Sequence, residues 1–541
     1  MVAQTAEPIS FEFLPQIPVV VQQHHGQISS DAGLLPLREF DAKLNYTQRM
    51  ADCLEDPKPN REHSLLSMLR QRFYGILAGY EDCNDHDTLR EDPIIKLVAG
   101  RLPDDTALAS QPTLSRFENL ATPAMLQKLV DFTIATGVER LKEKHGGRRP
   151  GLVTLDIDPT DDAAHGKQQL TLFHGYYDQF QYYPLIISEP TTKHVFVAWL
   201  RHGTAHASLG ADDDLMRIVN ALRAERPDIV IHVRGDAGLA TPQMYEVCET
   251  NGLLYTFGFS SNARLKSLTD DLMKKAEAQF EETKEKVRLF ACFQYRCDGW
   301  SVTRPVIAKV ECHAGGTNRR FVVTNVPSSC PLTPGLTDTA PVEAAILATA
   351  PIDTAPINTA PIQTAPIETA PIQTAPVETA PVAAPPATEP IKAAPVETAQ
   401  PQPTGITTAD EGEIVYDDYI QRGESEHRMD ELKNGLHMDR LSCHRFMANF
   451  FRLLLYTCAY NFLNAVRDDS RLPDVLRVGQ PCTWRTNMIK VAAEVVQTTR
   501  RVIIRLAAQW PWWPLYQAVS ARCIAFAPTV RITPVAFAPS S

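Results

Sequence analysis

Apolar residues recur at helical spacing in the N-terminal part of the chain. In Arg61–Tyr80 they return every three or four residues, which predicts an amphipathic helix that faces a core. Further helices are predicted at Ile94–Ala99 and Ala124–Lys144, with a short one at Thr113–Glu118. Residues 1–148 are therefore interpreted as a helical region and a candidate for DNA binding. A helix-turn-helix is conceivable, but a plain bundle is favoured because no turn glycine separates two clean helices.

From residue 149 the period changes. Leu152–Asp158 alternates as a strand does, and Asp228–Val233 is an apolar run typical of a buried strand. The other predicted elements are strands at Gln169–His174, Tyr182–Ser188, His194–Leu200 and Leu253–Gly258, a helix around Leu215–Leu222 and a helix that begins at Thr241-Pro242. This order predicts an α/β fold, of which residues 149–260 form the first part of the core.

Residues 261–328 are predicted to be a β-rich insertion that splits this core. A long charged helix at Arg264–Lys286 comes first. Three strand-like runs follow, at Arg288–Phe293, Val302–Glu311 and Arg320–Val326.

The segment 329–408 differs in composition from the rest of the chain. It holds 16 of the 41 prolines, and from Pro351 to Pro381 one falls every five residues in Thr-Ala-Pro-Ile/Val-x units. Proline lacks the backbone donor and fixes φ, so we predict a disordered, extended spacer. An inert insertion is favoured over a partner-docking element, because loop closure costs only about 0.6 kcal/mol per doubling of length.

Core helices are predicted again in 409–465, at Asp418–Lys433 and at Phe446–Leu463. In the first, about 100° of rotation per residue places four chemically active side chains on one face and Glu424 nearly opposite. These four are Tyr419, Arg422, Glu426 and Lys433. The alternative is a solvated helix with ion pairs four residues apart.

Charge is distributed unevenly along the chain. The net charge is −11, but the residues from Arg440 onward carry 13 Lys and Arg against 4 Asp and Glu, which leaves −20 on the preceding part. Residues 466–541 are interpreted as a basic helical region and tail, with a last helix at Asn487–Ala507. Its polar side would present Arg500, Arg501 and Arg505 to DNA phosphates, or the helix only packs.

No apolar run approaches the roughly 20 residues of a membrane span, and the N-terminus lacks the order of a signal peptide, so we expect a cytoplasmic protein without a membrane partner. Eleven irregularly spaced cysteines, none in a Cys-x-x-Cys pair, indicate neither a disulfide framework nor a zinc site.

Three carboxylates fall on elements that can converge. Asp156 and Asp158 share one face of a strand, where they repel each other unless a cation or hydrogen bonds hold them. Asp236 follows the Asp228–Val233 strand in a glycine-rich turn, and Glu426 comes from the helix. Without a His or Cys cluster, Asp158, Asp236 and Glu426 indicate Mg²⁺ or Mn²⁺. Their order is that expected of a ribonuclease-H-like mixed sheet with helical N- and C-terminal regions.

The helix motif makes the chain resemble a known family. Tyr419, Arg422, Glu426 and Lys433 match the Tyr-x2-Arg-x3-Glu-x6-Lys signature of insertion-sequence DDE transposases, and Asp158-Pro-Thr160 and Arg234-Gly-Asp236 resemble their aspartate motifs. Leu155–Gly175, Arg234–Leu239 and Ser442–Arg452 are similar to the insertion-sequence 1380 family, the group 1 DDE-domain transposases.

The resemblance implies a DNA transposase. Asp158, Asp236 and Glu426 would be the catalytic residues and would hold two divalent ions. Tyr419, Arg422 and Lys433 would bind DNA, and the partners would be terminal inverted repeats and target duplex, with a homodimer assembled on DNA. Two alternatives stay open: a transposase-derived DNA-binding protein without catalysis, and a ribonuclease-H-like metal-dependent nuclease outside a mobile element.

Overall fold

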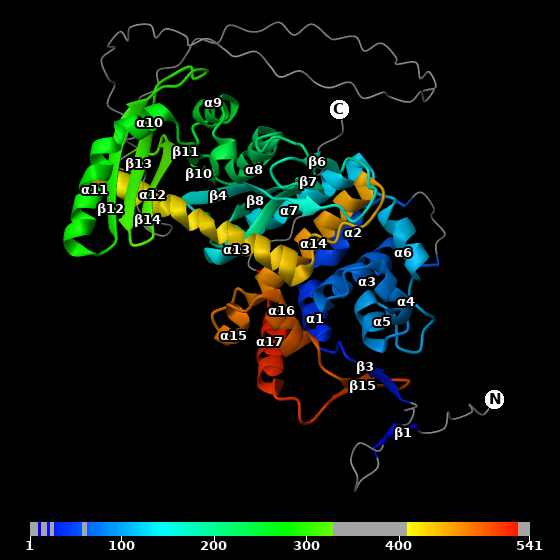
Figure 1. Ribbon diagram of the computed structural model, residues 1–541. Helices are drawn as coiled ribbons and strands as arrows, with labels where there is room; N and C mark the ends of the chain where they lie inside the picture. The colour runs from blue at the N-terminus through cyan, green and yellow to red at the C-terminus, as the bar shows by residue number, and fades with distance from the viewer. Residues whose placement is uncertain (1–8, 12–18, 22–25, 57–61, 328–407, 529–541) are drawn as a thin grey trace, which may run out of the picture. The chain divides into compact units, whose positions relative to one another are not determined.

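The computed structural model describes residues 9–11, 19–21, 26–56, 62–327 and 408–528 (Figure 1). The proline repeats of the predicted spacer and the last residues of the C-terminal tail lie outside the described residues, so the predicted disorder of the spacer stays a prediction.

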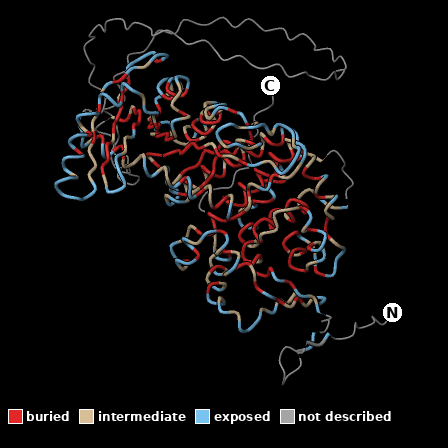
Figure 2. Tube along the Cα trace, in the orientation of Figure 1, coloured by how far each residue is buried: buried red, intermediate tan, exposed pale blue. Residues whose placement is uncertain are grey.

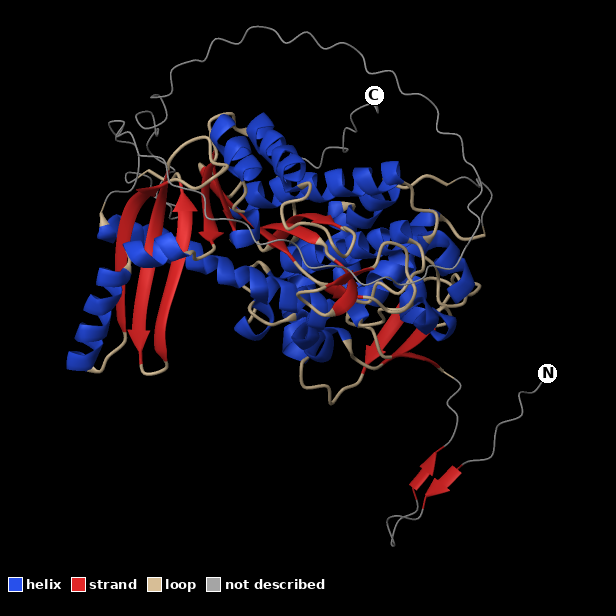
Figure 3. Cartoon of the chain, turned by 45° about the horizontal axis from the view of Figure 1, so that its top comes forward, coloured by secondary structure: helices blue, strands red, loops and turns tan. Residues whose placement is uncertain are grey.

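The described residues include a mixed sheet of eight strands, with β12, β13 and β14 at one side of the molecule (Figures 1 and 3). Its order is β12-β13-β14-β11-β10-β4-β8-β9; β4, β10 and β11 are parallel, and the other neighbouring pairs are antiparallel. The strands are β4 (Leu152–Pro159), β8 (Leu185–Glu189), β9 (His194–Trp199), β10 (Val230–Gly235), β11 (Leu254–Phe259), β12 (Val287–Tyr295), β13 (Arg304–His313) and β14 (Gly316–Thr324). The three strands predicted as an insertion are present, and through β14 they continue the same sheet.

Helices cover both faces of this sheet. On β13, Ile307 faces α12 (Ala409–Ile420), whereas Val310 and Cys312 face α11 (Asp270–Thr283), as the two-residue period of a strand requires. The other helices around the sheet are α7 (Pro123–Lys144), α8 (Ala211–Glu225), α9 (Pro242–Thr250), α10 (Ala263–Leu268) and α14 (Phe446–Arg467). Buried residues concentrate in the strands and in α14 (Figure 2). The predicted helix Arg264–Lys286 is interrupted at Thr269, whose hydroxyl bonds to the carbonyl oxygens of Leu265 and Lys266.

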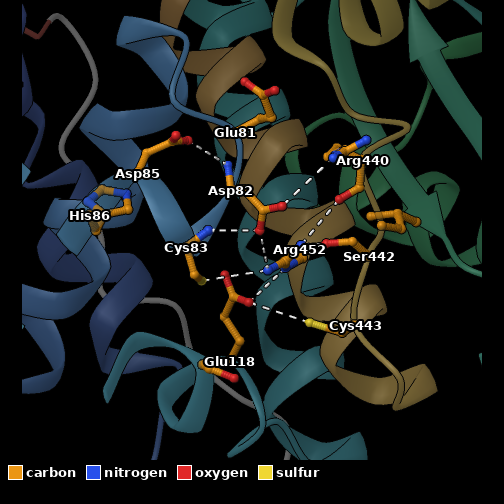
Figure 4. A network of polar contacts seen from close by, with 12 residues as sticks. Glu81, Asp82, Cys83, Asp85, His86, Glu118, Arg440, Ser442, Cys443 and Arg452 are labelled. Atoms are coloured by element: carbon orange, nitrogen blue, oxygen red, sulfur yellow. Dashed lines mark hydrogen bonds and ion pairs between the residues drawn. The ribbon is translucent and has the colours of Figure 1, made fainter. Parts of the chain in front are cut away.

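The four predicted N-terminal helices are confirmed as α3 (Leu65–Ala78), α5 (Pro93–Ala99), α6 (Gln111–Glu118) and α7. The structure adds three helices that were not predicted, α1 (Leu34–Leu44), α2 (Tyr46–Asp52) and α4 (His86–Leu89). A buried charge network joins α3 and α6 to α14. The carboxylate of Glu118 accepts from Arg72 Nε at 2.9 Å and from Arg452 Nε at 2.7 Å. Figure 4 shows Glu118 with Arg452. Burial alone would raise the pKa of Glu118, but the two guanidiniums outweigh it and bring the pKa to about 2.

The prediction of a helix at Asn487–Ala507 is wrong. The segment forms an antiparallel hairpin of β15 (Ala493–Gln497) and β16 (Val502–Leu506), and β3 (Gln27–Ser29) pairs with β15. Both arms are rich in β-branched residues, which suit a strand better than a helix. The remaining C-terminal helices are α15 (Asp474–Arg477), α16 (Pro481–Trp484) and α17 (Trp513–Ala525).

The predicted helix at Asp418–Lys433 is helical but irregular. After α12 come a 3₁₀ turn at Gln421–Gly423, α13 (Glu424–Asp430) and a π turn at Glu431–Gly435. Figure 1 shows α12 and α13, in yellow, running along one face of the sheet from β12 toward β4 and β8. Smaller sheets pair β5 (Asp162–Ala163), β7 (Gln179–Tyr182) and β6 (Leu172–His174), and β1 (Ile9–Phe11) with β2 (Val19–Val21).

Candidate active site

The ends of two adjacent parallel strands bring Asp158 and Asp236 together. In the register of β4 and β10, Gly235 lies opposite Ile157, so the next residue on each strand is one of the two aspartates. Asp158 and Asp236 interact electrostatically, since the charge of Asp236 contributes to the raised pKa of Asp158. These two predicted site residues therefore lie at the same end of the sheet, where β4 and β10 end side by side.

Asp158 is buried and held by the helical segment that covers β4. Arg422 Nη1 donates to Oδ1 of Asp158 at 2.5 Å, and Ser425 Oγ donates to Oδ2. Burial nevertheless raises the pKa of Asp158 to about 6; Arg422 and Ser425 lower it, while Asp156 and Asp236 raise it further. The negative charge of this carboxylate is thus not fully compensated.

Asp236 caps a short 3₁₀ turn, Ala237–Leu239, with its Oδ1 accepting from the backbone N–H of Gly238 at 2.9 Å. Tyr419 lies beside this turn: a Cβ on Gly258 would come within 2.7 Å of the Tyr419 hydroxyl and 3.0 Å of the Ala237 nitrogen. The Arg422 guanidinium lies 5.7 Å from the centre of the Tyr419 ring. Arg422 therefore binds Asp158, and Tyr419 lies beside the turn that Asp236 caps.

Glu426 and Lys433 differ from Arg422 in that neither is hydrogen-bonded to Asp158 or Asp236. Glu426 is exposed, and Lys433 Nζ binds Asp161 Oδ1 at 3.0 Å. Among the residues that the structure describes, no group of three or more His, Cys, Asp or Glu side chains is placed to hold a metal ion. A 3₁₀ helix turns by about 120° per residue instead of about 100°, so the Gln421–Gly423 turn advances the following residues by about 60° and brings Ser425 to Asp158.

Asp156 holds this arrangement in place, a structural role that the sequence analysis did not predict. Its carboxylate binds Arg234 at 2.7 and 3.1 Å and Arg428 at 2.5 Å, and all three side chains are buried. Arg234 also donates to the carbonyl oxygen of Asp418 in α12 at 2.6 Å. The sequence did contain a signal for this role. Asp156 is a second carboxylate on the face of Asp158 in a largely apolar strand, and a buried carboxylate requires a cationic partner.

The basic C-terminal residues lie on the hairpin. Arg500 and Arg501 are exposed in the turn between β15 and β16, and Arg505 on β16 pairs with Glu494 across the hairpin at 3.0 Å. They remain candidates for phosphate contacts, presented by a different element from the predicted one.

No described helix is both long and apolar enough to cross a membrane. Acidic residues at adjacent strand ends, covered by a helical segment with Tyr419, Arg422 and Lys433, are features of a DDE transposase domain. A family model described as "Transposase DDE domain group 1" matches residues 11–334 and 402–526, and the chain belongs to this family.

Comparison with curated proteins finds no match. Among solved structures, the chain is similar to the Mos1 transposase paired-end complex with left transposon end, at 12% sequence identity and a TM-score of 0.15. The match covers 42% of this chain and 68% of that chain.

Proposed function

We propose that this protein is a DNA transposase that cleaves the ends of an insertion sequence of the 1380 family and joins them to target DNA by phosphoryl transfer. The observation that carries the proposal is the adjacency of Asp158 and Asp236 at the ends of β4 and β10, beneath Arg422. The strand order β9-β8-β4-β10-β11, with β8 antiparallel to β4, supports the ribonuclease-H-like core.

The donor set suits Mg²⁺ or Mn²⁺. Asp158 and Asp236 offer carboxylate oxygens side by side, and the raised pKa of Asp158 indicates a carboxylate that a cation would stabilise. We assign Asp158, Asp236 and Glu426 as ligands, the last on its motif position and on its place one residue after Ser425. Two bound ions would supply a nucleophile at neutral pH and stabilise charge on the attacking and leaving oxygens.

The other motif residues would bind the DNA backbone. The guanidinium of Arg422 and the ammonium of Lys433 would hold phosphates of the cleaved strand, and Tyr419 would position the same strand. Both cations are paired with aspartates in this structure, Arg422 with Asp158 and Lys433 with Asp161. DNA phosphates would therefore have to compete with carboxylates for them. The partners are double-stranded element ends and target DNA, with a homodimer formed on the DNA.

The test is strand cleavage of DNA that carries the inverted repeats flanking the gene. We expect Asp158→Ala, Asp236→Ala and Glu426→Ala each to abolish cleavage while binding of the same DNA persists. Glu424→Ala is the matched control, since Glu424 is an exposed acid two residues from Glu426. Full cleavage by one of the three variants would contradict the role of that residue.

One observation favours a second candidate, a transposase-derived DNA-binding protein without catalysis. Arg422 and Ser425 occupy both oxygens of Asp158, and Glu426 is exposed. This candidate predicts that the wild-type protein binds element ends but leaves both strands intact with Mg²⁺ or Mn²⁺. Cleavage by the wild type under either condition excludes it.

A further inference from the structure

A short hairpin beside the candidate active site exposes aromatic side chains. This hairpin, Leu172–Tyr182, consists of β6, β7 and their connecting turn and is named the aromatic ribbon here. Phe173 is 48% exposed, Phe180 61% and Tyr176 86%. Burial of such rings is favourable, so three exposed rings on one hairpin indicate a surface that meets a ligand.

Two of the rings form a pair on one face. Phe173 lies directly opposite Phe180 in the register of β6 and β7, so their side chains project from the same face of the ribbon. Their centroids are 5.6 Å apart in a T-shaped arrangement. One ring thus supports the other while both remain open to solvent.

The aromatic ribbon is continuous with the candidate active site. Gln179 on β7 donates to Asp161 Oδ2 at 3.1 Å, and the other oxygen of Asp161 binds Lys433. His174 lies 5.1 Å from Tyr177 and 5.6 Å from Tyr183, ring centre to ring centre. Burial and, to a smaller extent, the charges of Asp161 and Asp236 raise the pKa of Tyr177, so this tyrosine lies within electrostatic range of both carboxylates.

The base of the ribbon is fixed to the loop before α14. Gln168 Nε2 donates to the carbonyl oxygen of Cys443 at 2.9 Å, and the backbone N–H of Phe446 donates to Gln169 Oε1 at 3.2 Å. The hydroxyl of Tyr182 donates to the carbonyl oxygen of Gln169 at 2.8 Å. The exposed rings therefore stand on a fixed base, which lowers the entropy cost of binding.

The chemistry of these rings selects the ligand. A DNA duplex hides the faces of its bases by stacking and offers only their edges in the grooves, whereas an unpaired base presents a face that an aromatic ring can cover. Lys167, exposed on the preceding loop, adds positive charge that suits a nucleic acid backbone, and a backbone phosphate could compete with Asp161 for Lys433 beside the ribbon. We propose that the aromatic ribbon stacks on unpaired bases of DNA that enters the candidate active site. This inference rests on the proposed function.

The experiment compares two DNA probes with the full-length protein. One is a blunt 30-base-pair duplex, and the other is the same duplex with an unpaired tail of five dT nucleotides. We expect Phe173→Leu/Phe180→Leu to weaken binding of the tailed probe by roughly 10-fold or more, because each stacked base contributes about 1–3 kcal/mol. Binding of the blunt probe should change less than about twofold.

Matched variants separate stacking from general apolar contact. Phe180→Tyr keeps the ring and should bind the tailed probe as the wild type does, whereas Phe180→Leu keeps only the apolar volume and should lose affinity. Leu268→Ala removes an apolar side chain of similar exposure, 53%, on α10 and should change neither probe. Circular dichroism spectra equal to that of the wild type confirm that the variants fold.

The other outcomes of this experiment separate failure of the proposed function from failure of this inference. If the wild type binds neither probe, the proposed function fails together with this inference. If the blunt probe binds but the double variant loses nothing on the tailed probe, the inference alone is overturned. A double variant that changes the sedimentation of the protein without DNA, with unchanged DNA affinity, would show instead that the ribbon contacts a second copy of the chain.

Discussion

At the level of single residues, Asp156 ties the strand that carries Asp158 to the helical segment above it. Its partners Arg234 and Arg428 are as buried as Asp156 itself. Asp156→Ala would leave two guanidiniums without this carboxylate, and removal of one partner from a buried pair costs about 3–5 kcal/mol. We expect a loss of that size in the free energy of unfolding, measured by urea titration without DNA. Glu424→Ala should change the free energy of unfolding by less than about 0.5 kcal/mol. Equal stability of the two variants would contradict the stabilising role of the Asp156 ion pairs.

Gly258 makes room for Tyr419 beside Asp236. A Cβ at this position would meet the Tyr419 hydroxyl at 2.7 Å and the backbone nitrogen of Ala237 at 3.0 Å, so Gly258→Ala should displace both. We expect Gly258→Ala to lower cleavage in the wild-type background by more than it does in a Tyr419→Phe background, where the nearest atom is gone. A double-mutant cycle of cleavage rates measures this difference. Equal effects in the two backgrounds would show that Tyr419 and Gly258 act independently.

The sequence predicts the aspartates better than their surroundings. Asp158 and Asp236 follow from alternation and from a strand that ends in glycines, since both patterns are local. The contact of Ser425 with Asp158 could not be predicted. The three-residue 3₁₀ turn changes which residues of the next helix face Asp158, and no residue type in the sequence indicates such a turn. The partners of Asp156 come from β10 and α13, and only the folded chain brings those elements together.

At the level of elements, His194 joins β9 to two helices. Its Nε2 lies 2.9 Å from the carbonyl oxygen of Thr133 in α7, to which the neutral imidazole donates, and Asn461 of α14 lies 3.3 Å away. Burial lowers the pKa of His194 to about 3. The unfolded chain therefore takes up this proton first as pH falls from about 6.5, and the stabilising contribution of the neutral ring is lost toward pH 3.

His194→Gln keeps a hydrogen-bond donor but cannot titrate. Its free energy of unfolding should fall less steeply between pH 6.5 and 4.5 than that of the wild type, by up to about 1.4 kcal/mol per pH unit. Burial also lowers the pKa of His86 and of His232 to about 3. The wild type and His194→Gln both retain these two residues, so the difference between the two slopes reports on His194. Urea titrations at several pH values give the two slopes, and parallel slopes would show that His194 is not buried as a neutral ring.

The C-terminal hairpin shows why element type was mispredicted. Periodicity alone does not separate a helix face from a strand in such short apolar runs, although their Val and Ile content favours a strand. The pairing of β15 with β3 also joins residues more than 450 positions apart in the chain. Arg500 and Arg501 occupy the turn, which leaves them exposed. The phosphate contacts that we propose for them therefore do not require a helix.

The hairpin arginines predict a salt-dependent part of DNA binding. Replacing Arg500, Arg501 and Arg505 together by Ala should weaken binding of element ends and flatten its dependence on salt by roughly 0.9 log unit of slope per lost contact. Arg505→Ala alone should have the smallest effect, because Glu494 already pairs with that guanidinium. Filter-binding titrations at several salt concentrations measure the slope, and an unchanged slope would mean that the hairpin only packs.

At the level of the whole molecule, the sheet continues without a break from the core strands into β12–β14. The sequence predicted these three strands but not their place, because edge pairing of β14 with β11 leaves no local pattern. This continuity matters for the proline repeats, which lie between β14 and α12 in the sequence. The chain leaves the sheet after β14 and packs against it again at α12, so the same group of strands holds the chain before and after the repeats.

Described residues fix both of these ends. Val326, just after β14, packs in one cluster with Val415 and Tyr416 of α12. At the start of α12, Cys292 Sγ of β12 donates to the carbonyl oxygen of Thr408 at 3.2 Å. The position of the segment that carries Arg422 and Glu426 is therefore set by packing and not by the length of chain between Val326 and Thr408.

Deletion of Asp353–Glu378 tests this reasoning on the full protein. We expect the shortened protein to keep its thermal unfolding midpoint within a few degrees and to cleave paired element ends as well as the wild type, because the residues that remain still span two anchored ends. Polyproline recognition reads a three-residue turn, and a period of five does not keep the prolines on one face, so no docking function should be lost. A control deletion of α17 (Trp513–Ala525), whose Leu515, Val519 and Cys523 are buried in the core, should lower the unfolding midpoint. Loss of cleavage by a repeat deletion that unfolds like the wild type would show that the repeats contribute to the reaction, through spacing or through a bound partner.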